Sequence, residues 1–137
     1  MIYMEETMDI KEKANQYHDQ GFNCAQGVLC SCGDYTGLDE KTALAAAGGL
    51  GGGFRCGEIC GALSGAVMAV GLCCPYTDPQ DQAAKDKIAD LARYVTGQFK
   101  EEFGHVRCEE LKGKEHSCPE FIAFAAELAE KTIKEKI

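Results

Sequence analysis

The hydrophobic positions of this chain repeat at helical spacing from its beginning to its end. The longest regular example is the segment 80–103, where apolar residues recur every three or four positions between charged ones. Its apolar stripe consists of Ile88, Leu91, Ala92, Val95, Phe99 and Phe103. Shorter stripes of the same kind cover residues 10–17 and 119–135, and no strand-like alternation of useful length is present. The pattern therefore predicts an all-α protein.

The segment 60–72 contains no charged residue and is rich in glycine, alanine and valine. A helix that is apolar on every side is typical of the centre of a bundle. We therefore expect a compact helical bundle around this central apolar Gly/Ala-rich helix, wrapped by the amphipathic helices at 80–103 and 119–135. A chain of 137 residues suffices for one core, so we expect a single domain over residues 1–137.

Polar residues and glycines mark where the helices begin and end. Asn23 and Asp39 are suitable N-caps, and Gly104 can end the long amphipathic helix. Pro119 fits the first position of the last helix, which makes Cys118 its predicted N-cap.

Two glycine-containing segments interrupt the pattern. The range 33–37 separates two helices, and the range 48–53 is too rich in glycine for continuous regular structure. The second range follows a helix rather than a strand and lacks the Lys-Ser/Thr of a nucleotide-binding P-loop. As a series of backbone N–H donors it is better suited to an anion or to sulfur atoms.

The composition narrows the classes of function. A net charge of −8 leaves no basic stripe for nucleic acid, and the longest nearly apolar run, 59–74, is too short for a membrane span. The acidic start, Met1 to Glu6, has no basic region before an apolar stretch, so we expect no signal peptide. An odd number of cysteines, nine, then indicates metal or redox chemistry in a reducing, cytoplasmic location.

Four of the cysteines are predicted to stand at helix starts: Cys24, Cys60, Cys108 and Cys118. A helix N-terminus carries about half a positive charge, which favours the thiolate form of a cysteine. Thiolates ligate metals and attack disulfides. If the fold brings the four helix starts together, these residues form a metal-binding, cofactor-binding or redox centre. Gly61 and Gly65 share a helix face after Cys60, where close helix packing or a bulky cofactor has to offset their low helix propensity.

The remaining thiols and histidines give weaker signals. Cys56 precedes Cys60 by four residues and is a reserve fifth thiol, and His105 near Cys108 is either a ligand, a proton donor or a solvated helix-end residue. Free cysteine in an apolar helix usually packs as a small hydrophobe, which is the expectation for Cys30, Cys32, Cys73 and Cys74. We expect His18 and His116 at the surface.

The segments Phe22-Asn23-Cys24-Ala25 and Cys60-Gly61-Ala62-Leu63-Ser64-Gly65, followed by Phe103-Gly104, Cys108 and Cys118, resemble the C-GCAxxG-C-C family of proteins described as redox-active. The resemblance covers nearly the whole chain. It implies four family cysteines, which correspond to Cys24, Cys60, Cys108 and Cys118. It does not extend to Cys30, Cys32, Cys56, Cys73 and Cys74, which are extras of this chain.

Three hypotheses for the function remain open, beside purely structural use of the thiols. The four cysteines bind an iron–sulfur cluster for electron transfer or redox sensing. Alternatively, the chain is a thiol–disulfide oxidoreductase, whose exposed redox thiols are then Cys108 and Cys118 in their polar loop. The third hypothesis is a structural zinc protein in which the four cysteines ligate the zinc ion. We expect a redox partner protein, no nucleic acid and no membrane, and the small acidic chain is compatible with a homodimer.

Overall fold

The computed structural model describes residues 8–113 and 115–137. Within these ranges the chain forms helical segments joined by turns, and the prediction of an all-α fold is confirmed. The segments are α2 (Ile10–Asp19), α3 (Cys24–Ser31), α4 (Gly33–Thr36), α5 (Glu40–Ala47), η1 (Gly53–Gly57), α6 (Gly61–Cys73), α7 (Gln82–Phe103), α8 (Cys108–Leu111) and α9 (Cys118–Lys136). The acidic start, from which we expect no signal peptide, lies outside the described residues.

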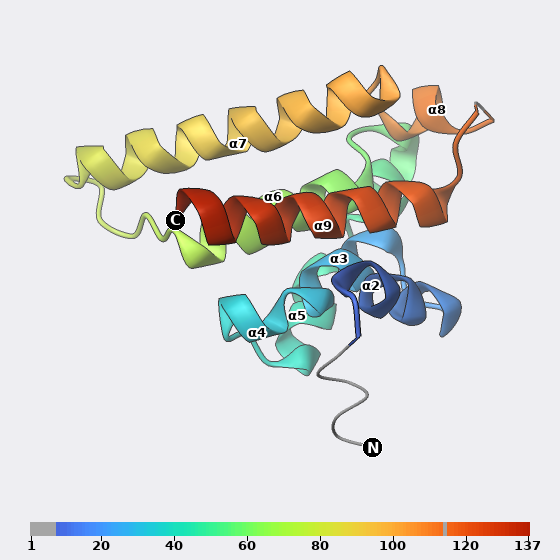
Figure 1. The fold of residues 1–137 in the computed structure, drawn as a ribbon, viewed down its shortest axis with the longest axis horizontal. Coiled ribbons are helices and arrows are strands. Elements are labelled where there is room, and N and C mark those ends of the chain that lie inside the picture. The colour runs from blue at the N-terminus through green and yellow to red at the C-terminus, as the bar shows by residue number, and fades with distance from the viewer. Residues whose placement is uncertain (1–7, 114) are drawn as a thin grey trace.

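The two longest helices, α7 and α9, run in opposite directions along the long axis of the molecule (Figure 1). Helix α6 packs against α9, α7 and α3, and α2 packs against both α3 and α9. The short helices α4 and α5 extend the side formed by α3. Helices α6 and α9 both begin at the end of the molecule where α8 lies, on the right in Figure 1.

Helix α6 has no charged residue and is buried over most of its length. Its buried residues are Gly61, Ala62, Leu63, Gly65, Ala66, Ala69 and Val70. The C-terminal end is more open, since Leu72 is 42% exposed. The position of this helix as the centre of the bundle remains a prediction. None of the described helices, α6 included, is both long and apolar enough to cross a membrane.

Glycines allow two pairs of helices to approach each other through their backbones. A Cβ atom at Gly65 of α6 would lie 2.8 Å from the Ala25 carbonyl oxygen and 3.2 Å from Val28 Cβ, both on α3. A Cβ atom at Gly27 of α3 would lie 2.6 Å from the Ala14 carbonyl oxygen on α2. Helix α3 therefore packs tightly between α2 and α6. This close packing explains why position 65 of α6 is a glycine.

Most of the predicted helix ends are found where the sequence indicates them. The Asn23 side chain accepts from the Gln26 N–H at 2.8 Å, and the Asp39 side chain accepts from the Thr42 N–H at 3.0 Å. Gly104 ends α7 in the left-handed conformation, with φ of +81°. The three residues thus end or begin helices as predicted.

The predicted N-cap of the last helix is wrong by one residue. The N-cap of α9 is Ser117, and Cys118 is already the first helical residue. The Ser117 N–H and hydroxyl donate to the Glu120 carboxylate at 3.2 and 3.3 Å, so this pair fixes the helix start. Pro119 is then the second helical residue, where its missing N–H still costs no intrahelical bond.

The two glycine-containing interruptions are present but are more ordered than expected. The range 33–37 contains the one-turn helix α4, which Gly37 ends with φ of +72°. A left-handed turn lies at the end of the segment 48–53 and continues just beyond it. Its φ angles are between +59° and +66° at Gly52, Gly53, Phe54 and Arg55. Glycine takes up this conformation easily, whereas Phe54 and Arg55 adopt it at a cost in conformational energy.

The close approach of α3 and α6 generates a stability prediction. Gly65→Ala should lower the free energy of unfolding by about 1–3 kcal/mol, because the added methyl group meets backbone atoms of α3. Gly97→Ala in α7 is the matched control. A Cβ atom there meets nothing within 4 Å, so the alanine should raise stability by about 0.5–1 kcal/mol. Urea unfolding followed by circular dichroism measures both, and a Gly65→Ala protein as stable as the parent would contradict the packing argument.

Candidate functional site

The four predicted cysteines, Cys24, Cys60, Cys108 and Cys118, line a single cavity of about 180 Å³. The cavity lies at the end of the molecule where α3, α6, α8 and α9 begin. Its other lining residues are His18, Asn23, Gly52, Leu111, Lys112 and Phe121. The fold thus gathers cysteines that are up to 94 positions apart in the sequence, whereas their role as ligands stays a prediction.

Each of the four cysteines stands at or next to the first residue of a helix. Cys24, Cys108 and Cys118 are the first residues of α3, α8 and α9, and Cys60 is the N-cap of α6. The free N–H groups of the first helical turn point out of a helix at this end. The cavity therefore receives the N-terminal ends of the long helices α6 and α9 and of α3.

A short antiparallel contact holds Cys60 and Cys108 in place relative to each other. Ile59 and Arg107 form an isolated β-bridge. The Cys60 N–H donates to the Val106 carbonyl at 2.8 Å, and the Cys108 N–H donates to the Glu58 carbonyl at 2.6 Å. The Arg107 guanidinium adds two contacts to the Glu58 carboxylate, at 3.2 and 3.3 Å. These bonds tie the start of α6 to the start of α8.

Gly61 gives the Cys24 thiol its place beside the start of α6. A Cβ atom at Gly61 would lie 2.5 Å from Cys24 Sγ and 2.9 Å from the Leu50 carbonyl oxygen. Any other residue at this position would push the Cys24 side chain away. The two glycines of the segment Cys60 to Gly65 therefore have separate functions, since Gly61 admits a sulfur atom and Gly65 admits a helix backbone.

The glycine-rich segment 48–53 contacts Asn23 at the edge of the same site. The Asn23 side-chain amide donates to the Gly48 carbonyl at 3.1 Å, while its oxygen caps α3. Gly51 lies directly against the Asn23 side chain, where a Cβ atom would clash. Asn23 thereby links the segment to the helix start that carries Cys24.

Burial opposes ionisation of the thiols in this cavity. Removal from water raises the pKa of Cys60 to about 12, although the N–H groups of Leu63 and Ala62 favour its thiolate. The neighbouring thiols Cys24 and Cys108 raise the pKa of Cys60 further. At this position the helix N-terminus is therefore outweighed by desolvation, and the prediction that it favours the thiolate accounts for only part of the balance.

The pKa of Cys118 depends on the same opposing effects and on one additional charge. Burial raises its pKa, as do Cys24 and Cys108, whereas the Lys112 ammonium lowers it. A bound cation would reverse this balance, because a thiol that coordinates a metal is deprotonated.

The expectation that Cys108 and Cys118 form an exposed pair is wrong for Cys108. Its side chain is buried, with 8% of its surface exposed, and Cys118 is half-buried. The polar sequence between them indicated exposure. However, the bridge to residues 58–60 turns Cys108 inward and leaves the Glu109 side chain outside.

The remaining cysteines lie outside the 180 Å³ cavity. Cys32 and Cys74 are buried in the hydrophobic core and Cys30 packs against it, in agreement with their interpretation as packing residues. Cys73 is half-buried near the end of α6, and Cys56 is exposed. All nine cysteines are free thiols.

Two cavity residues were not predicted from the sequence. His18 lies in the last turn of α2 and lines the cysteine cavity, although we expected it as a surface residue without a partner site. Lys112 follows α8 and supplies a positive charge near Cys118. No local pattern marks either residue, because their place depends on how α2 and α8 pack. His105 lies elsewhere, 3.7 Å from the Glu110 carboxylate.

No three His, Cys, Asp or Glu side chains within residues 8–113 and 115–137 are clustered closely enough to hold a metal ion. The four thiols surround the cavity instead.

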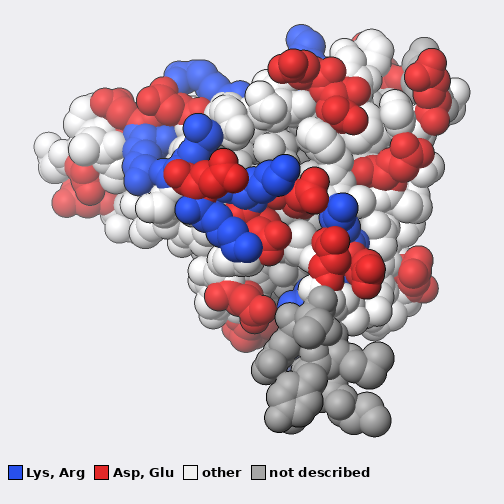
Figure 2. All heavy atoms as spheres, in the orientation of Figure 1, with Lys and Arg blue, Asp and Glu red and all other residues white. Residues whose placement is uncertain are grey.

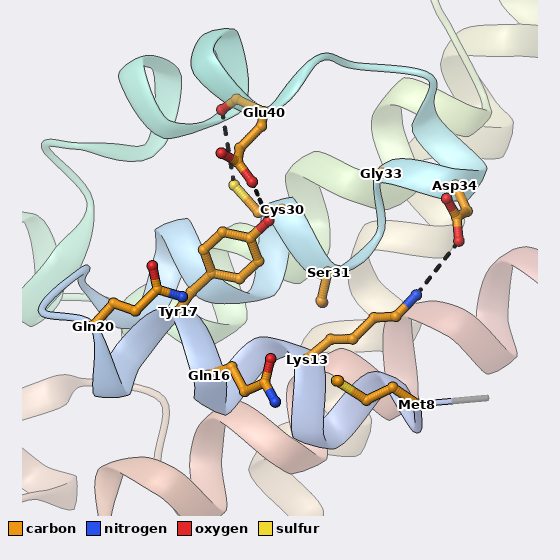
Figure 3. A pocket seen from close by; sticks show the side chains of 10 residues that line it. All are labelled: Met8, Lys13, Gln16, Tyr17, Gln20, Cys30, Ser31, Gly33, Asp34 and Glu40. Carbon is orange, nitrogen blue, oxygen red and sulfur yellow. Dashed lines mark hydrogen bonds and ion pairs between the residues drawn. The ribbon is translucent and has the colours of Figure 1, made fainter. Parts of the chain in front are cut away.

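A second cavity, of about 400 Å³, lies between α2 and the segment 30–40 (Figure 3). Its polar side chains are engaged with each other, since Tyr17 donates to the Glu40 carboxylate at 2.6 Å and Lys13 is 3.5 Å from Asp34. Cys30 is its one cysteine, and burial raises the pKa of that thiol to about 11. The cavity lacks the grouping of thiols that distinguishes the first.

Fold and site together define an all-α protein with a cavity lined by four cysteines. A family model described as "Putative redox-active protein (C_GCAxxG_C_C)" matches residues 22–132. The chain belongs to this family. Neither the curated proteins nor the solved structures contain a significant match to the chain.

The raised pKa of Cys60 predicts how this thiol reacts in reduced, metal-free protein. Its alkylation by iodoacetamide should still accelerate between pH 9 and 10, because an ordinary cysteine with a pKa of about 8.5 has nearly levelled off there. Peptide mapping by mass spectrometry reports the rate for each cysteine. The same protein in urea is the control, where all thiols should level off together. A Cys60 rate that levels off at pH 8.5 in the folded protein would contradict the desolvation argument.

Proposed function

We propose that this chain is a redox protein whose Cys24, Cys60, Cys108 and Cys118 thiolates bind an iron–sulfur cluster for electron transfer or redox sensing. The observation that carries the proposal is the meeting of these four cysteines, from four helix starts, around one cavity. Four cysteine thiolates are the usual ligand set of such clusters. Membership of a family described as redox-active supports the same class of function.

The electrostatics of the cavity favour a cationic occupant. Four thiolates that line one cavity repel each other, as the effects of Cys24 and Cys108 on the Cys60 pKa indicate. The N–H groups of Leu63 and Ala62 and the Lys112 ammonium offset part of this charge. Iron ions offset the remainder, so the donor set fits the proposed group.

The size of the cavity favours a cluster over a single zinc ion. Zinc requires four sulfur atoms at about 2.3 Å from one point. Here no three of the four thiols are clustered closely enough to hold a single ion, and the space they line, of about 180 Å³, suits a group of several atoms. The hydrophobic core, with Phe99, Leu63 and Ile122 fully buried, also gives the fold a source of stability apart from the site. A structural zinc site with four cysteine ligands is therefore the weaker alternative.

The other cavity residues provide the surroundings that an electron-transfer centre needs. Phe121 and Leu111, which are 4% and 3% exposed, exclude water from one side. Lys112 and the helix N–H groups stabilise negative charge on the sulfur atoms. An iron–sulfur cluster supplies one-electron transfer when bound, and burial with hydrogen bonding adjusts its potential.

The second candidate is thiol–disulfide exchange. It is favoured by the effect of Cys108 on the pKa of Cys118, which indicates that these two thiols of the cavity lie near each other. In this case the pair cycles between dithiol and disulfide with a redox partner protein.

Both candidates are expected to operate in the reducing cytoplasm, with a protein as electron donor or acceptor. The face of the molecule in Figure 2 presents acidic and basic side chains intermixed. Among the ion pairs of the structure, Lys11 lies 3.4 Å from Glu127. On this face we expect recognition of a partner through limited charge complementarity and not through a single large patch. A homodimer is compatible with this surface.

Anaerobic purification followed by iron, zinc and acid-labile sulfide analysis tests the proposal. The parent protein should be brown and contain iron and sulfide, and Cys60→Ser should lose roughly tenfold or more of both, because one of four ligands is removed. Cys73→Ser is the matched control, since Cys73 lies in the same helix but outside the cavity, and it should keep its iron. Undiminished iron in Cys60→Ser, or a colourless protein with stoichiometric zinc, would overturn the cluster proposal.

A further inference from the structure

A third, open cavity of about 540 Å³ adjoins the four-cysteine cavity and shares Gly52, Cys108 and Lys112 with it. Its remaining lining residues are Arg55, Cys56, Gly57 and Glu109. Cys56 is exposed to solvent, whereas Cys108 is buried and borders both cavities. The open cavity is thus lined by one accessible thiol and by one inner thiol of the proposed redox site.

The turn that carries Cys56 is firmly docked on the segment that carries Cys108. Segment η1 packs against α8, and a Cβ atom at Gly57 would lie 2.9 Å from the Glu109 carboxylate. Residues 57 and 109, which directly follow the two cysteines, are therefore in contact. The Cys108 N–H also donates to the Glu58 carbonyl at 2.6 Å, which holds the start of α8 against the end of η1.

The left-handed turn over residues 52–55 determines where Cys56 lies. Gly53 cannot be replaced without a clash, because a Cβ atom would collide with the backbone of Glu58. The Cys56 thiol is 3.6 Å from the Gly53 carbonyl oxygen, so the turn also fixes the side chain. Arg55 takes the left-handed conformation at a cost, and it borders the cavity beside Cys56 as a result.

The charges of the open cavity favour an anionic ligand. Arg55 and Lys112 contribute two positive charges. The Glu109 carboxylate contributes one negative charge, and it shares the Arg107 guanidinium, 3.2 Å away, with the Glu58 carboxylate. The charged residues that line the cavity therefore have a net charge of +1. A small acidic disulfide such as glutathione disulfide has both the charge and the sulfur chemistry that this cavity would accept.

We propose that Cys56 is the entry thiol of the redox site, which exchanges with a small anionic disulfide and passes the oxidation to Cys108. The Cys56 thiolate attacks one sulfur of glutathione disulfide, a mixed disulfide forms, and one glutathione leaves as its thiolate and takes up a proton. The Cys108 thiolate then attacks the Cys56 sulfur, the Cys56–Cys108 disulfide forms, and the second glutathione leaves. Two protein thiols lose two electrons and two protons, and glutathione disulfide becomes two glutathione molecules.

This inference rests on the proposed redox role of the four-cysteine site and adds its route to solvent. Formation of the Cys56–Cys108 disulfide removes Cys108 from the four thiols that line the inner cavity. The oxidation state of small thiols in the surroundings would in this way control whether the site has its full set of sulfur ligands.

The test treats reduced, iron-free protein with glutathione disulfide and maps the products by mass spectrometry over time. The parent should first carry glutathione on Cys56 and then convert to a Cys56–Cys108 disulfide. In Cys108→Ser the mixed disulfide on Cys56 should persist, and in Cys56→Ser the oxidation of Cys108 should slow by roughly tenfold or more because the inner thiol is buried. Cys73→Ser is the matched control and should behave as the parent.

Replacement of Arg55 tests the contribution of charge to the open cavity. Arg55→Ala should slow the reaction with glutathione disulfide by roughly threefold and leave the reaction with the cationic disulfide cystamine no slower. Oxidation of Cys108 at the parent rate in Cys56→Ser, or a mixed disulfide on Cys56 that never converts, would overturn the proposal. Because the protein in this test is free of iron, the outcome is separate from that of the iron analysis.

Discussion

The contact between the start of α6 and helix α3 is the constraint on which the site depends. Gly65 brings the two backbones together, and Gly61 leaves the space that the Cys24 sulfur occupies. Because the four-residue spacing places both glycines on one helix face, a single packing contact also sets the position of Cys24 beside Cys60. The bonds between residues 58–60 and 106–108 then add Cys108, and packing of α9 on α6 adds Cys118.

This arrangement has an electrostatic consequence that connects fold and chemistry. Helix N-termini direct N–H groups toward the sulfur atoms, but burial and the neighbouring thiols raise the pKa of Cys60 to about 12. The protein therefore gathers two buried and two half-buried thiols in a place where anionic sulfur becomes favourable once positive charge is bound. The same features that oppose free thiolates would exclude water from the proposed redox centre, so burial would aid that function even though it disfavours ionisation.

Much of the fold and the positions of the four cysteines at helix starts were predictable because they depend on local signals. The apolar stripe of residues 80–103, the caps at Asn23 and Asp39 and the stop at Gly104 are each encoded within a few neighbouring residues. The places of His18 and Lys112 at the cavity were not predictable, since they depend on packing between distant elements. The predicted N-cap of the last helix, Cys118, is wrong because Pro119 fits the second helical position as well as the first. The Ser117–Glu120 pair makes Ser117 the N-cap. The left-handed turn at Phe54 and Arg55 contradicts local propensity and is imposed by its surroundings.

The central claim is that Cys24, Cys60, Cys108 and Cys118 together ligate one iron–sulfur cluster. Iron X-ray absorption spectroscopy of the anaerobically purified protein tests it most directly, because the method reports the atoms around the iron itself. The account predicts a first shell made of sulfur alone with a second iron atom in the next shell. Iron with nitrogen or oxygen neighbours and no neighbouring iron would contradict it.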